Sequence, residues 1–500
     1  MPEKLFISTS IPYVNAAPHI GHALEFVQGD VLARYYREKG FDVFFLTGTD
    51  ENSLKNVLAA EKRGIDVKVH VKENSDIFEK LTKVLDISND DFIRTTEERH
   101  IAGAQKLWNA CDKAGDIYKK KYEGLYCVGC ESFYTEKDLV NGLCPEHQTK
   151  PEVVKEENYF LKLGKYQDKL KKLIENDELK ITPASRKNET LEFINKGLED
   201  LSISRSQARA HGWGIPVPGD SSQVEYVWFD ALSNYINVIG YANDEKRFQD
   251  WWVNNKRKIH LVGKGIARFH TVYWPIMLLS AGLPLPSEII VHGYFTINGQ
   301  KISKSIGNVI DPFSVVKKYG VDPTRYFLLR EIPSGKDGDF SYERLEARYN
   351  GDLANNLGNL VSRVAKLIET NLEGELIFNP EFLDKEAEKR IEAAKQKYEK
   401  AVEEFQLHTA LSHIWELLDY ANVYIDGKKP WVDAKESPEK FLKTITTSTT
   451  IILESAKLLK PFLPETFEKI YKTFGFEPGV GAKEDKIIIS EIKPLFPKLQ

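Results

Sequence analysis

The first apolar runs of the chain alternate with segments of helical spacing. Residues 4–10 are a short apolar run that predicts a strand, and a loop rich in Pro, Asn and Ala follows. From Gly21 onward the apolar positions take helical spacing, and residues 42–47 predict a second strand that ends in Gly48-Thr-Asp50. Strand, loop and helix in alternation predict an α/β fold with a doubly wound parallel sheet, whose ligands bind beyond the carboxyl ends of the strands. Asp50 would then point into the site.

This alternation is interrupted between about residues 118 and 224 by cysteines and a Lys-rich segment. Strand patterns return at residues 258–262 and 288–297, so the interruption predicts an insertion that splits the α/β fold. From about residue 344 the chain forms long amphipathic patterns, which predict a separate all-α domain. The Pro/Gly-containing stretch 333–339 is the expected hinge before it. The expected divisions are 1–117, 118–224, 225–320, a linker at 321–345, and 346–500.

Composition narrows the class of protein. With 500 residues, 42% of them hydrophobic, the chain can bury a large core. A formal charge of −5 excludes a surface coated in positive charge, so a nucleic-acid contact would be a local patch. The chain has no apolar run of about 18 residues, and its first residues lack an apolar secretory core. Four cysteines, three of them close together, suit a reducing compartment, and we expect a cytoplasmic protein.

Two histidines lie where the first loop becomes a helix, in His19-Ile-Gly-His22. At a helix N-terminus the backbone N–H groups and the helix dipole favour a phosphate, and Gly21 lets a nucleotide approach the backbone. Imidazole N–H groups can stabilise charge that develops on a phosphoryl group. By itself, the motif is equally compatible with two ordinary histidines beside a turn.

A second candidate for phosphate chemistry is the loop Asn298-Gly-Gln-Lys-Ile-Ser-Lys-Ser305, which follows a predicted strand and contains two lysines. Flexible lysine side chains can neutralise a leaving pyrophosphate. A Lys/Ser loop taken alone is more often solvated surface. In this order along the chain, however, His-x-Gly-His and Lys-Ile-Ser-Lys-Ser resemble the two signatures of the class I aminoacyl-tRNA synthetases.

Cysteine and histidine spacing predicts a metal site. Cys127-Val-Gly-Cys130 and Cys144-Pro-Glu-His147 are two tight pairs separated by thirteen residues. Three thiolates with one imidazole are a common tetrahedral set for Zn²⁺, and four protein ligands leave no open position, so one structural zinc per chain is expected. Buried thiols plus a surface histidine are the alternative, and Cys111, alone on a predicted helix, is interpreted as a core thiol.

Five segments together resemble the methionyl-tRNA synthetase family, and the similarity covers essentially the whole chain. They are residues 11–22, Gly48-Thr-Asp50, Tyr226-Val-Trp-Phe-Asp-Ala231, Phe269-His-Thr-Val-Tyr-Trp-Pro275, and 291–305. The resemblance implies a Rossmann-type catalytic domain split by a zinc-containing insertion of the single-knuckle bacterial form, then a helical-bundle anticodon-binding domain. It also implies a reaction, in which L-methionine is activated by ATP and Mg²⁺ to methionyl-adenylate and transferred to the 3′ end of tRNA(Met), initiator tRNA included.

Carried over position by position, the resemblance implies a methionine pocket. Asp50 would bind the substrate ammonium, and His270 or Tyr13 would place a polar group near the sulfur. Core packing remains the alternative for each aromatic residue taken singly. The implied pocket comprises Ser10, Ile11, Tyr13, Asp50, Trp228, Ala231, Leu232, Tyr235, Ile266 and His270.

The resemblance also implies an ATP site. His19 and His22 would stabilise the transferring phosphate, and Lys301 and Lys304 the leaving pyrophosphate. The implied site comprises His19, Gly21, His22, Gly263, Lys301, Ser303 and Lys304.

Two positions depart from the family's pattern. Where Asp-Glu-His-Gly is expected the chain has Asp50-Glu-Asn-Ser53, and where Gly-Lys-Asp-Ile is expected it has Gly263-Lys-Gly-Ile266. Gly265 cannot supply the carboxylate that lies near the ribose in the family. Adenosine binding would therefore rely on other groups.

Anticodon-reading positions are implied in the helical segment. Asn359 and Arg363 stand four residues apart on one helix face, and Pro430-Trp431 places an indole at a helix break. Arg and Trp can stack on splayed bases. A solvated helix face is the alternative for the Asn/Arg pair.

The same sequence features argue against four alternative functions. Isoleucyl, valyl and leucyl synthetases need a large editing domain, for which the interruption is too short. A cysteinyl synthetase would need zinc with an open position, and a small-molecule nucleotidylyltransferase would not need the carboxyl-terminal helices. Intact signature residues argue against a non-catalytic RNA-binding relative. The lack of an appended carboxyl-terminal domain favours a monomer.

Overall fold

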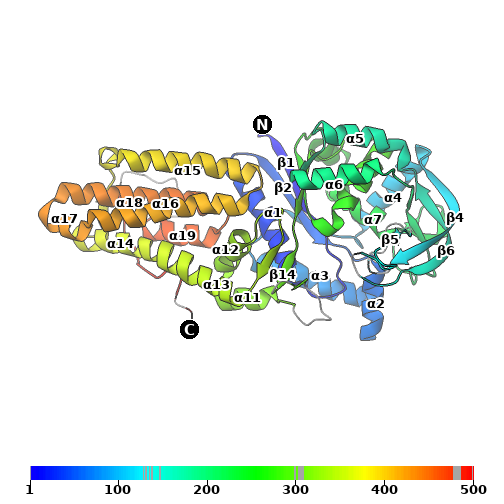
Figure 1. Ribbon diagram of the computed structural model, residues 1–500, viewed down its shortest axis with the longest axis horizontal. Coiled ribbons are helices and arrows are strands. Elements are labelled where there is room, and N and C mark those ends of the chain that lie inside the picture. Colours follow the sequence, from blue (N-terminus) through cyan, green and yellow to red (C-terminus); the bar gives the residue numbers. More distant parts are fainter. Residues whose placement is uncertain are drawn as a thin grey trace. The chain divides into compact units, whose positions relative to one another are not determined.

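The chain folds into two compact units, Met1–Gly293 and Tyr294–Gln500 (Figure 1). This computed structural model describes residues 2–127, 129, 132–134, 136, 139–145, 148–297, 300–301, 309–476, 486–497 and 499. Among these residues, no helix combines the length and the apolar character needed to cross a membrane.

A six-stranded parallel sheet forms the centre of the first unit. The strand order is β3-β2-β1-β12-β13-β7, and every neighbouring pair is parallel. The central strands are almost wholly buried, because both faces of a parallel sheet are covered by helices. This confirms the predicted α/β parallel sheet. The strands are β1 (Lys4–Thr9), β2 (Asp42–Thr49), β3 (Asp91–Arg94), β7 (Lys180–Thr182), β12 (Lys258–Gly263) and β13 (Glu288–His292).

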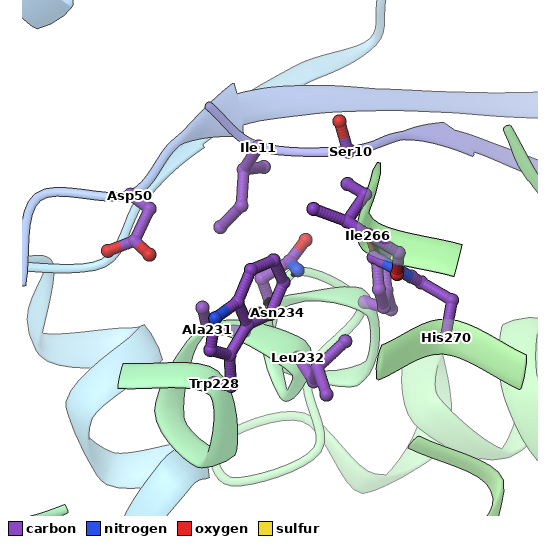
Figure 2. A pocket seen from close by; sticks show the side chains of 10 residues that line it. Ser10, Ile11, Asp50, Trp228, Ala231, Leu232, Asn234, Ile266 and His270 are labelled. Atoms are coloured by element: carbon purple, nitrogen blue, oxygen red, sulfur yellow. Dashed lines mark hydrogen bonds between the residues drawn. The ribbon is translucent and has the colours of Figure 1, made fainter. Parts of the chain in front are cut away.

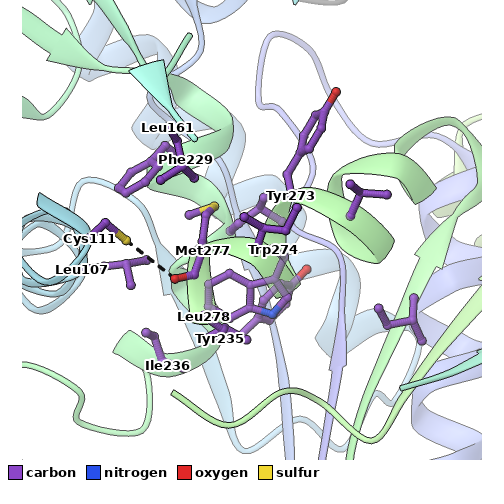
Figure 3. Packing of buried hydrophobic residues seen from close by; sticks show 14 of the residues in the cluster. Leu107, Cys111, Leu161, Phe229, Tyr235, Ile236, Tyr273, Trp274, Met277 and Leu278 are labelled. Carbon is purple, nitrogen blue, oxygen red and sulfur yellow. Dashed lines mark hydrogen bonds between the residues drawn. The ribbon is translucent and has the colours of Figure 1, made fainter. Parts of the chain in front are cut away.

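Helices enclose this sheet and supply its core. Figure 3 shows Leu107 and Cys111 facing Met277 and Leu278 across one buried cluster, and the Cys111 thiol donates to the Met277 carbonyl at 3.6 Å. The helices are α1 (Ile20–Glu38), α2 (Leu54–Arg63), α3 (Val67–Val84), α4 (Glu98–Lys113), α5 (Gln167–Glu175), α6 (Ala184–Asn195), α7 (Val227–Leu232), α8 (Asn234–Asn237), α9 (Glu245–Phe248) and α10 (Trp274–Ser280), with the shorter turns η2 (Gly164–Tyr166), η3 (Gln249–Val253), η4 (Lys264–Ile266) and η5 (Phe269–Tyr273).

The interrupting stretch builds two small antiparallel sheets. One has the order β5-β4-β6-β8 and the other β10-β11-β9. The same stretch also supplies β7, which pairs with β13 at the edge of the parallel sheet, so it is not wholly outside the α/β fold. The strands are β4 (Ile117–Cys127), β5 (Ser132–Tyr134), β6 (Glu152–Leu161), β8 (Leu201–Ser202), β9 (Ser204–Ser206), β10 (Pro216–Val217) and β11 (Asp220–Glu225).

Two local expectations were wrong. Residues 288–297 are not one strand, because β13 ends at His292 and β14 (Phe295–Ile297) pairs instead with β15 (Gln300–Lys301) and β16 (Gly338–Phe340). The stretch 333–339 does not separate the units, since residues before it pack into the second unit. Arg325, fully buried, donates to the carbonyl of Phe462 at 2.8 Å.

The second unit is a bundle of amphipathic helices, as predicted. Asp384 caps α15, where its carboxylate accepts from the N–H of Glu386. Helices α15, α16 and α18 run side by side and pack on one another (Figure 1). The helices are α11 (Pro312–Tyr319), α12 (Val321–Glu331), α13 (Tyr342–Arg348), η6 (Tyr349–Gly358), α14 (Asn359–Asn371), η7 (Pro380–Phe382), α15 (Lys385–Glu403), α16 (Leu407–Lys428), α17 (Pro430–Glu436), α18 (Pro438–Leu459) and α19 (Pro464–Thr473), with the strand pair β17 (Glu375–Ile377) and β18 (Lys486–Ile488).

Candidate active site

A cavity of about 240 Å³, its open mouth included, lies beyond the carboxyl ends of β1, β2 and β12 (Figure 2). The loops that follow these strands meet α7 and α8 there, as expected for a doubly wound sheet. Every residue expected for the methionine pocket except Tyr13 lines the cavity, and Asn234 lines it without having been expected. The lining residues are Ser10, Ile11, Asp50, Trp228, Ala231, Leu232, Asn234, Tyr235, Ile266 and His270.

A tyrosine–histidine pair forms the polar floor of the cavity. His270 Nδ1 lies 2.9 Å from the Ile266 carbonyl, which can only accept, so Nδ1 carries the proton. The Tyr235 hydroxyl therefore donates to Nε2, at 2.7 Å. Burial lowers the pKa of His270 to about 4, and burial together with the charge of Glu25 raises the pKa of Tyr235. Both groups are neutral at pH 7.

A second buried histidine, His260, packs against Tyr235. Trp274 Nε1–H donates to Nε2 of His260 at 3.2 Å, so His260 carries its proton on Nδ1 and donates to the Ser8 hydroxyl at 2.7 Å. Burial holds the pKa of His260 well below its usual range. The Tyr235 ring lies 4.1 Å from the His260 ring, centroid to centroid. The floor therefore rests on a packed, uncharged aromatic layer.

An aromatic wall closes one side of the cavity. Trp228 stacks on Phe269 with ring centroids 3.8 Å apart and planes inclined by 8°. Tyr13 does not line the cavity but packs edge-on against Trp228 at 6.1 Å, and the Lys55 ammonium lies 4.5 Å above the Tyr13 ring. Tyr13 is therefore placed to hold the indole in position.

Among the described residues that line the cavity, Asp50 is the one carboxylate, and its surroundings orient it. The N–H of Asn52 donates to its Oδ1 at 3.0 Å, and Asn56 Nδ2 donates to its backbone carbonyl at 3.1 Å. The Asn52 amide also donates to Asp230 at 3.0 Å and to the Thr95 carbonyl at 3.2 Å. Asn52 thus connects the end of β2 to α7, which carries Trp228.

The adjacent departure from the family's pattern also has a local reason. Ser53 is the N-cap of α2, where its hydroxyl accepts from the N–H of Lys55 at 3.1 Å. A glycine here would provide no such side-chain cap. Asn52 and Ser53 are therefore accommodated by hydrogen bonds of their own.

The two motif histidines cap α1 reciprocally. Gly21 N–H donates to Nδ1 of His19, and His19 N–H donates to Nδ1 of His22, both at 3.1 Å. Their rings stack with centroids 3.8 Å apart. Because backbone N–H groups occupy both Nδ1 atoms, each neutral imidazole carries its proton on Nε2. The helix cap thereby selects two Nε2–H donors at a helix N-terminus that already favours anions.

Glu25, one turn after His22, was missed by sequence reasoning. Its Oε1 accepts from the N–H and the hydroxyl of Ser10, at 2.7 and 2.5 Å. Its Oε2 lies 2.8 Å from Nε2 of His292. A side chain at Gly263 would meet this pair, since a Cβ there would lie 3.6 Å from the His292 ring. A partly buried acid–imidazole pair therefore lies beside Gly263, whereas Gly265 is exposed.

Comparisons with known proteins show the family of this chain. The model for class I (M) tRNA synthetases matches residues 5–150 and 138–365, and that for the anticodon-binding domain of tRNA ligases matches 384–497. The Methionine–tRNA ligase of Brucella suis is 44% identical over 94% of this chain and 91% of its own length, and that of Thermotoga maritima is 43% identical over 95% and 76%. The chain belongs to the methionyl-tRNA synthetases.

A solved structure extends this finding to the fold. Mycobacterium tuberculosis methionyl-tRNA synthetase in complex with methionyl-adenylate is 38% identical with a TM-score of 0.94, covering 99% of this chain and 100% of that one. Membership confirms the expected activity, ATP-dependent, AMP-forming ligation of methionine to tRNA. It also confirms a class I catalytic domain followed by a helical anticodon-binding domain.

The predicted pyrophosphate loop of this synthetase is described only in part. Lys301 ends β15, and its side chain is not described. Ser303 and Lys304 lie outside the described residues, so their roles stay predictions.

The predicted zinc ligands are likewise only half described. Cys130 and His147 lie outside the described residues, and within the described part of the chain no cluster of three His, Cys, Asp or Glu side chains suits a metal. Cys127 and Cys144 are both buried, and both contact Thr149. The Cys127 sulfur lies 3.9 Å from the Thr149 hydroxyl, and Cys144 N–H donates to the Thr149 carbonyl at 2.9 Å.

The expected anticodon residues lie at one end of the bundle of this synthetase. Asn359 begins α14 and is exposed, and Arg363, one turn later, pairs with Asp426 at 2.6 Å. Pro430 is the first residue of α17, a helix that packs on α14. Trp431 follows it, and 47% of its surface is exposed.

Proposed function

We propose that the cavity is the methionine site of this synthetase and that the histidines at the start of α1 act on the α-phosphate of ATP. This proposal rests on one observation: side chains from separate segments of the chain line the same cavity. They are Asp50, Trp228, Tyr235 and His270. An apolar cavity with few convergent polar groups is the usual form of a small-molecule site.

The polar end of the cavity suits an amino acid. Asp50 would accept hydrogen bonds from the substrate ammonium, a charge-assisted contact that Asn52 pre-orients by donating to Oδ1. The Trp228 indole N–H is buried and has no acceptor among the described residues, so it offers a donor to the substrate carboxylate.

The far end of the cavity suits a neutral, polarizable side chain. Ile11, Leu232 and the face of Trp228 provide apolar contact, and thioethers pack favourably on aromatic rings. His270 is uncharged, so the described residues that line the cavity offer no cation to pair with an acidic side chain. We infer that the site selects a long, unbranched, uncharged substrate such as methionine.

The reaction follows from these positions. The methionine carboxylate attacks the α-phosphorus of ATP·Mg²⁺, a new carboxyl O–P bond forms, and pyrophosphate leaves. The Nε2–H groups of His19 and His22 would donate to the α-phosphate oxygens as charge develops on them. Lys301 and Lys304 would neutralise the leaving pyrophosphate. The terminal ribose hydroxyl of tRNA then attacks the carbonyl carbon, and AMP leaves.

On the nucleotide side, two glycines allow close approach and the partly buried carboxylate of Glu25 lies nearby. Gly21 and Gly263 would let the nucleotide approach the protein backbone, and Ser303 completes the expected ATP site. Glu25, held by Ser10 and His292, would supply the carboxylate that Gly265 cannot.

We further propose one structural zinc on Cys127, Cys130, Cys144 and His147. The donor set suits Zn²⁺, and the hydrogen bonds of Thr149 bring the strand end at Cys127 and the turn at Cys144 together. The zinc would link these two turns and take no part in the reaction.

In the helical unit, we propose that Asn359, Arg363, Pro430 and Trp431 bind the CAU anticodon of tRNA(Met). The half-exposed indole at the start of α17 offers a stacking surface for a splayed base. The divisions 1–117, 118–224, 225–320, 321–345 and 346–500 are proposed as functional segments, and the protein as a cytoplasmic monomer.

ATP–pyrophosphate exchange with a panel of amino acids tests the proposal. Methionine should give the highest kcat/KM, and Asp50→Asn should raise KM for methionine more than KM for ATP. An equal or higher kcat/KM for isoleucine or cysteine would overturn the assignment.

A further inference from the structure

The interrupting stretch contacts the loop of Asp50 through a tryptophan. Trp213 lies in the turn between β9 and β10, and its indole Nε1–H donates to the backbone carbonyl of Glu51 at 2.8 Å. Glu51 directly follows Asp50, which lines the cavity, and is itself buried, with 2% of its surface exposed. A contact that spans 162 positions of the sequence therefore ends beside Asp50.

The acceptor of this hydrogen bond belongs to the peptide group that orients Asp50. The Glu51 carbonyl and the Asn52 N–H are the two polar ends of one planar peptide, and they point in opposite directions because this peptide is trans. The Asn52 N–H donates to Oδ1 of Asp50 at 3.0 Å. Trp213 therefore holds one end of a peptide group whose other end holds the carboxylate.

This arrangement stabilises the orientation of the carboxylate in two ways. The planar peptide cannot turn its N–H away from Asp50 without also moving its carbonyl away from the indole. A donor on the carbonyl also polarises the peptide, which makes its N–H a stronger donor to the carboxylate. Removal of the indole N–H would free the peptide to rotate and would leave the carbonyl of a buried residue without this donor.

The turn that contains Trp213 is itself anchored. The N–H of Gln207, in the same turn, donates to the Ser222 carbonyl on β11 at 3.0 Å. His211 of this turn pairs with Glu61 on α2 at 2.8 Å, but both side chains are about half exposed, so solvent screens this contact. The indole is therefore held by a fixed backbone and makes the more buried of the two contacts.

We propose that Trp213 orients the Asp50 carboxylate for the substrate ammonium, through the peptide between Glu51 and Asn52. This inference rests on the proposed methionine site, in which Asp50 accepts from that ammonium. Trp213 is not among the residues that line the cavity, so it is a positioning residue. The interrupting stretch thereby contributes to amino-acid activation through a residue other than the predicted zinc ligands.

Trp213→Phe tests this inference, because it keeps an aromatic ring and removes the N–H donor. In ATP–pyrophosphate exchange it should raise KM for methionine about 3- to 10-fold, the cost of one hydrogen bond. KM for ATP and Tm should stay unchanged, since the indole is partly exposed and does not line the cavity. Equal rises in both KM values, or a variant that does not fold, would make the indole structural and overturn the inference.

His211→Gln is the matched control. It changes the same turn and removes the contact with Glu61, but it leaves the peptide between Glu51 and Asn52 untouched. This variant should keep the wild-type KM for both substrates. A rise in KM for methionine as large as that of Trp213→Phe would show that any change in the turn disturbs the site, and the inference would be wrong.

A double variant tests whether Trp213 acts through Asp50. If it does, Trp213→Phe should have little further effect in the Asp50→Asn background, because the charge that it orients is already gone. Rises in KM that multiply in the double variant would overturn the inference.

Two inhibitors test the same point without a second substitution. Methioninol keeps the ammonium of methionine, whereas deaminomethionine has a hydrogen in place of the amino group. Trp213→Phe should weaken inhibition by methioninol about 3- to 10-fold and leave inhibition by deaminomethionine unchanged. Equal weakening of both inhibitors would contradict an action on the ammonium site.

Asp50→Asn separates failure of this inference from failure of the proposed function. An unchanged KM for methionine in Asp50→Asn would overturn the proposed ammonium site and this inference together. A raised KM in Asp50→Asn, with wild-type kinetics in Trp213→Phe, would overturn this inference alone.

Discussion

Tyr235 donates a hydrogen bond to Nε2 of His270 across 2.7 Å inside the cavity, and the direction of this bond sets the charge of the site. The tyrosine can donate only because His270 keeps its single proton on Nδ1, facing the Ile266 carbonyl. Protonation of His270 would remove the acceptor and place a cation in an apolar cavity.

This relationship predicts a pH-dependent stability. Burial lowers the pKa of His270 from 6.5 to about 4 on folding. Between these two pH values the unfolded chain binds the proton more readily than the folded chain. The free energy of unfolding is therefore highest above about pH 6.5 and decreases as the pH falls toward 4. From pH 7 to pH 5 the wild type should lose about 2 kcal/mol more unfolding free energy than His270→Gln. Urea denaturation at both pH values measures this.

A matched control is His211→Gln, at an exposed histidine of the same unit. It should show the wild-type loss between pH 7 and pH 5. Equal losses for wild type and His270→Gln would mean that His270 is not held neutral by burial.

The reciprocal histidine cap predicts that capping and catalysis can be separated. His19→Asn keeps a side-chain acceptor for the Gly21 N–H, so α1 should keep its stability, but the Nε2–H donor is lost. Exchange should fall by about 10²- to 10³-fold, the usual cost of removing one such donor, without a change in Tm. His19→Ala should lower exchange similarly and also cost about 1 kcal/mol of stability. Near-normal exchange in His19→Asn would leave His19 with a capping role alone.

The proposed knuckle predicts which thiols matter for metal content. Elemental analysis should find about one zinc per chain, lost on combined Cys127→Ser and Cys144→Ser substitution. Cys111→Ser is the control, because burial raises the pKa of the Cys111 thiol to about 12 and its partner is the Met277 carbonyl. It should retain the zinc. A zinc-free protein with full activity would contradict the proposal.

The helical unit contains two tryptophans of opposite exposure, which separate anticodon binding from folding. Trp431→Ala should leave exchange near normal while lowering kcat/KM for tRNA in aminoacylation about 5- to 150-fold, since one stacking contact is worth about 1–3 kcal/mol. Being half-exposed, Trp431 should contribute little to stability. Trp415, 5% exposed and packed on Tyr326, should instead cost about 3–5 kcal/mol when truncated.

Lys304→Ala completes this comparison from the catalytic side. It should slow exchange itself, because the lysine would act on charge that develops only in the transition state.

Unchanged charging of tRNA with the CAU anticodon by Trp431→Ala, or an equal fall in exchange, would make the indole structural.

Much of this protein was determined by local patterns in the sequence. Apolar runs and helical spacing predicted the parallel sheet and the helical unit, because the periods of strands and helices depend on near neighbours. The resemblance to the methionyl-tRNA synthetase family predicted the pocket residues, and all of them except Tyr13 line one cavity. The position of Asp50 at the end of β2 followed from the strand pattern alone.

Tertiary structure decided what depends on partners distant in the chain. Glu25 became part of the site through its contacts with Ser10 and with His292, which is 267 residues away. The spacing of residues along the sequence predicts neither contact. The apolar run 288–297 forms two strands, because β14 pairs with β15 and β16 and not with the parallel sheet. An apolar pattern does not specify which strands pair. Asn234 looked like any helix residue until packing buried its carboxamide and left Oδ1 facing a cavity. Hydrogen-bond satisfaction is a property of the packed molecule, so only the folded chain shows which buried polar group still needs a partner.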